Sequence, residues 1–416
     1  MSDSADVVVV GAGTIGGWAS YFARSSGAER VVVLEKNVAG YGASSRAAGI
    51  VRAQGGSQET ARLGRWSIDF YNRQSSVLGT DSGFRELGYL LLAVTKRDVR
   101  EGHERLRMQR AIGLDVRWLE PQEAVSVSPV LAPEGHRGGT FLPTDGAIDP
   151  PRNVRAYSLA MQLVGVDLRE RTPCVGFRIE RSNGTARVTG VETPGGVIET
   201  RRVVLTGGPT LRALARLLGV SVPVGGARHQ VAVTEPHAAF ARERLPMVFD
   251  VRAGLYWRLE EEGLLFGMSN PAEVPGVARS IDWPYLWRMR RRLERLVPAT
   301  AGLGLRKVWA ATIDYTPDHL PILGPALTPS GDAIGGVTIA APGGHGMMWG
   351  PAVARVAADL ALEGRTDVVA LERLGLDRFD EHGRSRAAAD PIALPFPAAA
   401  GDEEDLLGAD TAGGDL

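Results

Sequence analysis

The chain shows two patterns of apolar and polar positions: continuous apolar runs in some segments and alternation of apolar and polar residues in others. Residues 6–10 and 30–36 each contain a continuous apolar run, and the two are separated by a glycine-rich turn and an alanine-rich stretch expected to be helical to about Ser25. Strands that are apolar on both faces and joined through a helix are typical of a parallel sheet covered on both sides. We therefore expect a β-α-β unit in this part of the chain.

Alternating positions farther along the chain predict a second, antiparallel kind of sheet. The alternation is clear in "RHQVAVTE", "LYWRLE" and "GLLFGMS", within residues 228–268. Strand–glycine–helix units recur in "VVLTGGPTLRALARLLG" and at residues 339–364. The other expected elements are helices over residues 56–78, 99–112, 146–164 and 283–299, and strands over residues 88–95, 175–181, 186–193 and 197–205.

The order of these units predicts two interleaved domains, because strand–glycine–helix units lie at the start, middle and end of the chain. The first domain would consist of residues 1–85, 146–225 and 312–383, and the second of residues 86–145 and 226–311. The remaining residues, 384–416, are rich in Ala, Gly, Asp and Glu. Such a composition predicts a disordered, mildly acidic tail.

Composition bounds the function classes. The chain of 416 residues is 44% hydrophobic and 23% charged, as in an ordinary globular protein. Its formal net charge of −1 gives no reason to expect a nucleic acid or an anionic membrane as partner. A single cysteine, Cys174, excludes an internal disulfide and a cysteine-based zinc site, and no metal is expected. Since neither a signal peptide nor an apolar run of about 18 residues is evident, a cytoplasmic location is expected.

The first glycine-rich turn carries the clearest binding signal. Gly11, Gly13 and Gly16 form a G-x-G-x-x-G motif between an expected strand and an expected helix. These glycines permit a tight turn, close approach of a pyrophosphate, and packing of helix on strand. Glu35 ends the next strand, where a carboxylate can bind an adenosine ribose; a solvated strand-end carboxylate is the alternative. The motif predicts dinucleotide binding and disfavours NADP, but it does not distinguish NAD from FAD.

Further segments resemble, in order, the FAD-dependent superfamily of D-amino acid oxidase and sarcosine oxidase. They are "YGASSRAAGIVRAQG", "DGAIDPPRNV", "VVLTGGPTLRALARLLG", "LYWRLEEEGLLFG", "TIDYTPDHLPILGP" and "GGHGMMWGPA". The resemblance implies a mixed α/β fold, with a Rossmann-type FAD domain interleaved with an antiparallel-sheet substrate domain. It implies oxidation of a C–N bond in a secondary amine, an N-methyl amino acid or a D-amino acid. Hydride would pass to flavin N5, the imine would hydrolyse, and O2 or another acceptor would reoxidise the flavin.

Two other functions stay open at this point. The chain could be the flavin subunit of a hetero-oligomeric amine, proline or sarcosine dehydrogenase, and a homo-oligomer is also possible. An NAD-linked dehydrogenase would account only for the first forty residues or so. In each case the substrate is a small molecule.

The resemblance implies a set of FAD contacts from several parts of the chain. They are Gly11, Gly13, Thr14, Ile15, Gly16, Glu35, Lys36, Ser44, Ser45, Arg46, Gly49, Ile50, Val175, Gly207, Gly208, Gly343, Gly344, His345, Gly346, Met347 and Met348. Arg46 would help to neutralise the diphosphate, and Val175 would meet adenine through its backbone. The turn at residues 343–348 would face flavin N1 and the C2 carbonyl, where a helix N-terminus stabilises arriving negative charge.

Several positions depart from the family pattern. Where some relatives tether the flavin through a cysteine, this chain has Ala311, and Cys174 is expected to lie far away. Other relatives use an N-terminal histidine, but the first histidine here is His103, so we expect non-covalent FAD. Leu265 stands where sarcosine oxidases place a lysine near flavin N5. Because a positive charge there assists the reaction with oxygen, its loss argues against fast oxygen use.

The candidate catalytic residues are Arg52, Tyr256, Arg258, His345 and Met348. Arg52 matches a family arginine that binds the substrate carboxylate, and Met348 replaces the lysine that accompanies it. Arg258 lies two residues from Tyr256 on one strand face and could replace that lysine, unless it is a surface residue. His345 is expected to act through its backbone N–H rather than as a general base.

The apolar cluster around Met348 either favours a bulky or less polar amine or reflects ordinary helix packing. Two further residues are expected to be structural: His229 at a sheet junction and Asp318 in a turn. No Ser/His/Asp triad or catalytic carboxylate pair is evident, as expected where the cofactor carries the chemistry.

Overall fold

Five parallel strands form the centre of the larger sheet in the computed structural model, which describes residues 3–182, 184–241, 244–395 and 397. In spatial order they are β10 (Asp167–Arg169), β3 (Val31–Leu34), β2 (Val7–Val10), β14 (Val203–Leu205) and β21 (Ala333–Ala341). Both faces of β2, β3 and β14 are buried, which explains their continuous apolar sequences.

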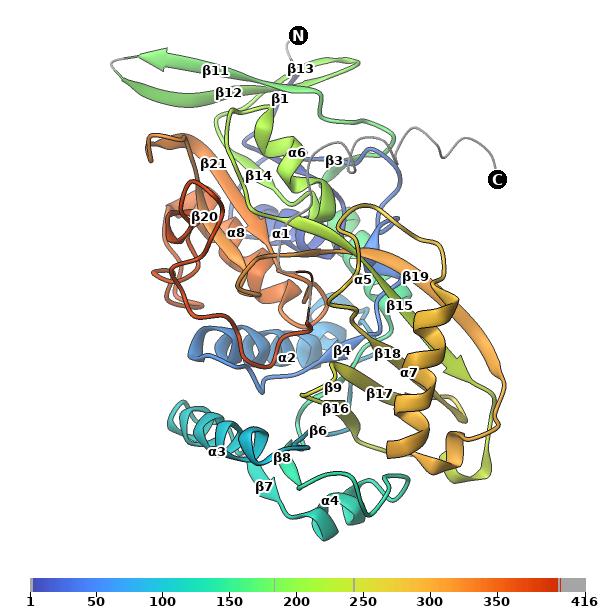
Figure 1. The fold of residues 1–416 in the computed structure, drawn as a ribbon. Coiled ribbons are helices and arrows are strands. Elements are labelled where there is room, and N and C mark those ends of the chain that lie inside the picture. The colour runs from blue at the N-terminus through green and yellow to red at the C-terminus, as the bar shows by residue number, and fades with distance from the viewer. Residues whose placement is uncertain (1–2, 183, 242–243, 396, 398–416) are drawn as a thin grey trace.

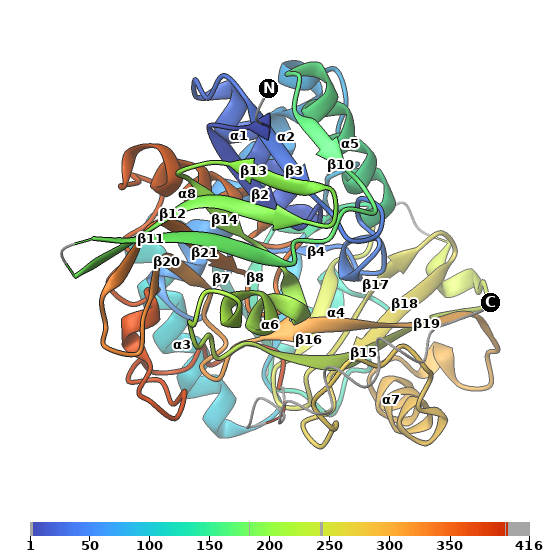
Figure 2. The ribbon, with the colours of Figure 1, turned by 90° about the horizontal axis from the view of Figure 1, so that it is seen from above.

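Alternate residues of these strands face two different cores. Val7 and Val9 pack against α1 (Thr14–Ser25), α5 (Pro150–Leu163) and α8 (Gly350–Glu363). Val8 and Val10 pack on the other side, where α6 (Leu211–Arg216) lies (Figure 2). The Asp149 side chain caps α5 by accepting a 2.9 Å hydrogen bond from the Arg152 N–H.

A β-meander extends this sheet beyond β21. It contains β12 (Thr185–Thr193), β11 (Gly176–Ser182), β13 (Gly196–Glu199) and β1 (Asp3–Ser4), and β20 (Ile322–Leu327) pairs with β21. The run at residues 197–205, expected as one strand, is two: β13 pairs antiparallel with β12, and β14 joins the parallel centre. Residues 200–202 between them redirect the chain, with the Arg202 N–H bonded to the Thr200 hydroxyl.

The second sheet has eight strands and is mostly antiparallel. In spatial order they are β19 (Leu305–Tyr315), β15 (Gly225–Thr234), β18 (Gly263–Met268), β17 (Leu255–Glu260), β16 (Met247–Asp250), β6 (Tyr89–Leu92), β8 (Gly139–Leu142) and β7 (Arg117–Leu119). Only the β16–β6 pair in this sheet is parallel. Helix α7 (Trp283–Leu296) covers one face of the sheet (Figure 1), which leaves the opposite face for a site.

Short elements link the two sheets. A three-stranded sheet contains β4 (Ile50–Val51), β9 (Gly146–Ala147) and β5 (Arg85–Glu86). The remaining helices are α2 (Gln58–Leu78), α3 (Lys96–Ala111) and α4 (Pro121–Val127), with 3-10 turns η1 (Ala43–Ser45), η2 (Gly208–Thr210), η3 (Ala238–Phe240), η4 (Pro298–Thr300) and η5 (Leu376–Arg378). The second sheet draws its strands from residues 89–142 and 225–315, so the chain passes repeatedly between the sheets.

The C-terminal part of the chain differs from the expected disordered tail. Residues 384–395 are described and partly buried, and Ser385 donates a hydrogen bond to Asp318. Asp318 also forms a buried ion pair with Arg378, at 2.7 and 3.0 Å, which agrees with its expected structural role. The apolar residues among 384–395 therefore pack on the body of the protein. The acidic stretch at residues 398–416 lies outside the described residues.

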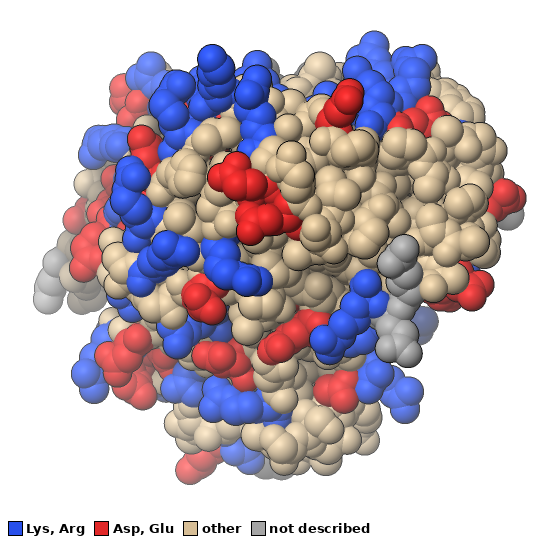
Figure 3. Space-filling model, turned by 90° about the horizontal axis from the view of Figure 1, so that it is seen from below, with Lys and Arg blue, Asp and Glu red and all other residues tan. Residues whose placement is uncertain are grey.

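The surface agrees with the near-neutral composition. On the face that Figure 3 shows, Lys and Arg side chains are interspersed with Asp and Glu. Among the helices of the described residues, none has both the length and the apolar character needed to cross a membrane.

Candidate cofactor and substrate site

A cavity of about 800 Å³ lies between the two sheets. Its wall includes Lys36 and Cys174 at one end, the first glycine turn in the middle, and Arg52, Tyr256 and His345 at the other end. A volume of this size lies within the range of sites for small molecules and cofactors. The cavity thus joins the carboxyl ends of the parallel strands to the uncovered face of the second sheet.

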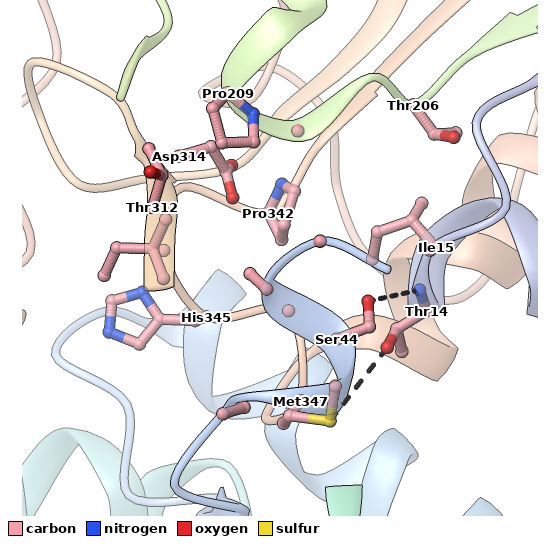
Figure 4. A pocket seen from close by; sticks show the side chains of 18 of the residues that line it. Thr14, Ile15, Ser44, Thr206, Pro209, Thr312, Asp314, Pro342, His345 and Met347 are labelled. Carbon is pink, nitrogen blue, oxygen red and sulfur yellow. Dashed lines mark hydrogen bonds between the residues drawn. The ribbon is translucent and has the colours of Figure 1, made fainter. Parts of the chain in front are cut away.

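The first glycine turn presents the N-terminus of α1 to this cavity (Figure 4). Gly11 has a φ of 102°, and a Cβ on Gly16 would lie 1.8 Å from the Gly11 carbonyl oxygen, so glycine is required at both positions. Gly13 is the N-cap of α1 and offers no side-chain cap to the helix. The Thr14 N–H donates to Ser44 Oγ at 2.9 Å. A helix start left open in this way is a site for phosphate.

Glu35 supports the same turn from the end of β3. One carboxylate oxygen accepts a 2.9 Å hydrogen bond from the Ala12 N–H, and the other accepts a 2.8 Å bond from the Asn37 N–H. Glu35 is half-buried and lies in the cavity wall beside Lys36. A carboxylate fixed by two backbone donors keeps free lone pairs, which suits a ribose hydroxyl.

The second glycine turn, at residues 343–348, closes the far end of the cavity. The Gly343 N–H donates to Asp314 Oδ2 at 3.1 Å, and burial raises the pKa of Asp314 to about 6. Tyr71 donates its hydroxyl proton to the Met347 carbonyl at 2.8 Å. Figure 4 shows the Met347 sulfur directed at the Thr14 hydroxyl, so this turn is tied to the start of α1.

His345 is held as a neutral side chain in this turn. Its Nδ1 lies 3.0 Å from the Gly343 carbonyl oxygen and its ring stacks on Trp349 at 4.3 Å. Because a carbonyl only accepts, Nδ1 carries the proton and Nε2 is bare. Burial lowers the pKa of His345 to about 3.

A chamber beside this turn is mainly apolar with few polar groups. Its side chains are Arg52, Tyr89, His229, Phe249, Tyr256, Met347, Met348, Ile392 and Leu394. His229 Nε2 lies 2.6 Å from the Tyr256 hydroxyl, and the two rings stack at 5.7 Å. Burial lowers the pKa of His229 to about 4 and raises that of Tyr256. Both groups are therefore neutral near pH 7.

The chain matches a known family over most of its length. Residues 6–360 match the model of the FAD dependent oxidoreductase family, DAO. The chain belongs to this family. Its cofactor is therefore FAD, and the predicted fold class of a Rossmann-type domain joined to an antiparallel sheet is confirmed.

Curated relatives and solved structures support this assignment. The 4-methylaminobutanoate oxidase (formaldehyde-forming) of Paenarthrobacter nicotinovorans is 30% identical over 321 residues, which are 75% of this chain and 38% of that protein. Sarcosine oxidase subunit beta of an Arthrobacter species is 27% identical, over 77% of this chain and 79% of that subunit. The L-proline dehydrogenase of P. horikoshii superposes with a TM-score of 0.82 at 25% identity, covering 91% of this chain and 98% of that one.

The methylaminobutanoate oxidase is much longer than the segment it shares with this chain. The same holds for mitochondrial dimethylglycine dehydrogenase of Rattus norvegicus, which is 27% identical over 78% of this chain and 39% of its own length. This chain thus spans less than two fifths of either relative.

The geometry fits FAD at both ends of the cavity. The open N-terminus of α1 offers donors to a diphosphate, and a Cβ on Gly13 would lie 3.1 Å from Ser44 Oγ and fill that cradle. Gly207 and Gly208 line the cavity opposite, on the turn after β14. The backbone of residues 343–348 would lie against the flavin ring. Gly49 and Ile50 of the same wall line the cavity between these ends.

Five predicted FAD contacts lie outside the cavity wall. They are Gly16, Ser45, Arg46, Val175 and Gly343. Gly16 and Gly343 act through the turns that they shape. Val175 is 51% exposed and its N–H is bonded to the Glu192 carbonyl, because β11 begins one residue later than expected.

Cys174 lies in the cavity wall, at the end away from the flavin turn. It lines the cavity with Pro173 at the end expected to hold adenine. Burial raises its pKa to about 11, so its thiol is protonated and unreactive.

Arg258 is neither in the cavity wall nor on the surface. It is only 5% exposed, and its Nε donates to the Ala48 carbonyl at 2.7 Å. Nη1 donates to the Leu259 carbonyl at 3.0 Å and pairs with Glu260 at 2.5 Å. The loop that contains Ala48 covers this end of β17, so the guanidinium anchors the loop.

Two side chains of the cavity wall are not among the predicted site residues, and one of them, His229, is expected from the sequence to be structural. Arg279 lines the cavity and lies 4.6 Å from the centre of the Tyr41 ring, which Arg46 approaches from 5.4 Å. Nothing in the local sequence around Arg279 indicates this contact. His229 could have been found, because alternation along β15 places it on the same face as Val231 and Val233, which face the chamber.

Proposed function

We propose that this protein oxidises a C–N bond of a secondary or tertiary amine, with an N-methyl group as the favoured site. The observation that carries the proposal is the chamber itself, in which the neutral His229–Tyr256 pair and apolar side chains adjoin the turn at residues 343–348. Bound FAD would accept a hydride from the carbon next to nitrogen, and the resulting imine would hydrolyse in water.

The His229–Tyr256 pair would hold the substrate nitrogen in the required protonation state. An ammonium has no lone pair to support loss of hydride from the neighbouring carbon, so the substrate must react as the neutral amine. The pair favours that form, because both groups are neutral and linked at 2.6 Å, so they offer the nitrogen hydrogen-bonding partners but no negative charge that would stabilise an ammonium. The apolar wall also disfavours a charged nitrogen.

Relatives support the choice of substrate class. The names of the methylaminobutanoate oxidase, dimethylglycine dehydrogenase and sarcosine oxidase subunit beta all refer to N-methylated compounds. Met348, which packs in the core beside the chamber, provides no charge for a small amino acid. An N-methylated amine with an apolar substituent therefore suits this wall better than glycine.

Anaerobic bleaching of the flavin would test the proposal. The purified protein would be mixed without oxygen with N-methylated amines, N-methyl amino acids, and D- and L-amino acids, and the flavin absorbance followed. We expect N-methylated amines to reduce the flavin fastest and to release formaldehyde in equal amount. If D- or L-amino acids reduced the flavin and N-methylated amines did not, the proposal would be rejected.

A second candidate is the flavin subunit of a hetero-oligomeric dehydrogenase, which passes electrons to a partner. Two observations favour it. Leu265 is buried and apolar, and the chain covers 79% of sarcosine oxidase subunit beta. In this case the same amine chemistry occurs, but reoxidation depends on another protein.

A further inference from the structure

The wall of the chamber is completed by residues that lie beyond the matched family region. That region ends at residue 360, whereas Ile392 and Leu394 both line the cavity. Ile392 is 1% exposed and packs in one cluster with Tyr89, Phe249 and Tyr256. The segment of residues 390–394, called here the C-terminal wall, thus contributes two branched apolar side chains to the place where substrate would bind.

The C-terminal wall is firmly anchored through Asp390. Its carboxylate accepts hydrogen bonds from the Thr60 hydroxyl at 2.9 Å and from the Gly56 N–H at 3.2 Å, at the start of α2. It also accepts a 3.0 Å bond from the Ile392 N–H. A Cβ on Gly56 would lie 2.0 Å from the Asp390 carboxylate, so glycine permits this approach. Asp390 fixes where the next two residues lie.

The C-terminal wall also forms a hydrogen bond with Arg52, the cationic side chain of the chamber. Arg52 Nη2 donates to the Ile392 carbonyl at 2.9 Å, and Nη1 donates to the Gln54 carbonyl. Arg52 is 3% exposed. A carboxylate normally binds a guanidinium through two parallel hydrogen bonds. Here backbone carbonyls already take one hydrogen bond from each terminal nitrogen.

Arg258 and Met348 provide no replacement for Arg52. The Arg258 guanidinium is used by the loop at Ala48 and by Glu260, and Met348 is uncharged. A substrate carboxylate that approached both terminal nitrogens of Arg52 would meet the Gln54 and Ile392 carbonyls, which already take one donor of each. An apolar substituent would instead lie against Ile392 and Leu394 without displacing any hydrogen bond.

We propose that the C-terminal wall determines substrate specificity, by occupying Arg52 with the Ile392 carbonyl and lining the chamber with Ile392 and Leu394. The chamber then selects N-methylated amines whose larger nitrogen substituent carries an apolar group, not a carboxylate. This inference rests on the proposed amine oxidation and adds the substrate class.

Acetate, as the simplest carboxylate, gives a direct test. The FAD-bound protein would be titrated with acetate while the flavin absorbance is recorded, without any turnover. Asp390→Ala should release the wall and free Arg52, and lower the Kd for acetate by at least about 10-fold. Asp380→Ala is the matched control, because Asp380 caps a neighbouring turn through His382 and Arg384 and does not line the chamber. The control should leave the Kd unchanged.

Two further variants separate the carbonyl from the side chain. Ile392→Gly keeps the carbonyl on Arg52, so acetate should bind as weakly as in the wild type, while KM for an amine with a larger apolar group changes. Asp390→Ala combined with Arg52→Gln should lose the gain in acetate affinity. If Asp390→Ala, with FAD and thermal stability retained, bound acetate no more tightly than the wild type, the inference would fail.

The milder Asp390→Asn variant keeps the test decisive if Asp390→Ala does not fold. Loss of the carboxylate charge weakens the bonds to Thr60 and Gly56, so acetate should again bind more tightly than in the wild type. An unchanged Kd would overturn the inference. Failure of the proposed function is seen separately, as an unbleached wild-type flavin with every amine, because acetate binding requires no reaction.

Discussion

The buried His229–Tyr256 pair shows how packing determines protonation at a single residue. Neither side chain has a charged partner among the hydrogen bonds that the structure describes: Nε2 contacts the Tyr256 hydroxyl, and Nδ1 contacts Ser269 Oγ at 3.3 Å. Removal from water disfavours the charged imidazolium, and nothing nearby compensates. The pair therefore stays neutral and offers no charge to an ammonium, so it favours binding of the neutral amine.

Tyr256→Phe should slow flavin reduction by about 5- to 10-fold, the effect of losing one hydrogen bond of about 1 to 1.4 kcal/mol to the substrate nitrogen. The change removes the hydroxyl and leaves the ring, so substrate still fits the chamber. Anaerobic stopped-flow reduction would measure it. Tyr285→Phe is the matched control, since that hydroxyl bonds to the Ser269 carbonyl at 2.5 Å and does not line the cavity. Equal rates in Tyr256→Phe and wild type would contradict the role of the pair.

His229 should also affect stability as a function of pH. Burial lowers its pKa from 6.5 to about 4, so between these values the unfolded chain binds a proton that the folded chain does not. The contribution of this group to the free energy of unfolding is fully present above pH 6.5 and is lost as the pH decreases to 4. A tenfold difference in proton affinity between the folded and unfolded chains corresponds to about 1.4 kcal/mol of stability.

His229→Gln should therefore flatten the decline in Tm between pH 6.5 and 4. Glutamine can still bond to Tyr256 but does not titrate. His345 contributes in the same direction, since its pKa is lowered to about 3. Asp145 contributes in the opposite direction, since burial raises its pKa to about 7. Both groups remain in the variant, so the difference between the two pH profiles isolates His229. Parallel profiles would refute the buried, neutral assignment.

At the scale of one element, the turn between β2 and α1 contains one glycine that folding requires and another that cofactor binding requires. A Cβ on Gly16 would lie 1.8 Å from the Gly11 carbonyl oxygen, within the protein itself. A Cβ on Gly13 would meet only Ser44 Oγ, at 3.1 Å, and Gly13 has an ordinary φ of −79°. The two glycines are thus needed for different reasons.

Gly13→Ala should weaken FAD binding by at least about 10-fold, roughly 1.4 kcal/mol, with little change in the Tm of the FAD-free protein. Gly16→Ala should lower both the affinity for FAD and the Tm of the FAD-free protein, because helix α1 can no longer pack on β2. Flavin fluorescence titration and thermal melts of the FAD-free protein would measure the two effects. A large loss of Tm in Gly13→Ala, or none in Gly16→Ala, would contradict this division.

Strand β17 shows how much of a site can be predicted from the alternation of side chains along a strand. Alternation along β17 correctly places Tyr256 and Arg258 on one face, since their cross-strand partners are Gly267 and Leu265. It does not show where the cavity ends on that face. The loop at Ala48 closes the cavity before Arg258, and such a contact joins residues 210 positions apart.

At the scale of the whole molecule, ordered motifs identified the family and the fold because each carries its own local chemistry. Arg279 and Ile392 were missed because they reach the cavity only through the packing of distant segments. The C-terminal segment is the clearest case. Its composition indicates disorder, yet Asp390 and Ile392 have specific partners on α2 and beside Arg52. Composition averages over a segment, whereas burial depends on single residues.

The choice of electron acceptor is also a property of the whole molecule, because it depends on the residues around the flavin and on any partner protein. Leu265 is 1% exposed and packs in the cluster with Tyr256 and Ile392, although it is not itself part of the cavity wall. The resemblance to sarcosine oxidases matches it to a lysine near flavin N5. A nearby cation stabilises the superoxide formed when electrons pass to oxygen. Leu265 provides no such charge.

We therefore expect the isolated, substrate-reduced protein to react with dissolved oxygen at least about 10-fold more slowly than with a one-electron dye acceptor, the size of effect that a lost electrostatic contact produces. Stopped-flow recovery of the flavin absorbance would compare the two. Leu265→Lys should speed the oxygen reaction, more so at lower pH, because burial lowers a lysine pKa and the charged form dominates there. Leu265→Met, unbranched but uncharged, should not. Rapid turnover of the isolated wild type in air would show that no partner is needed and exclude the subunit alternative.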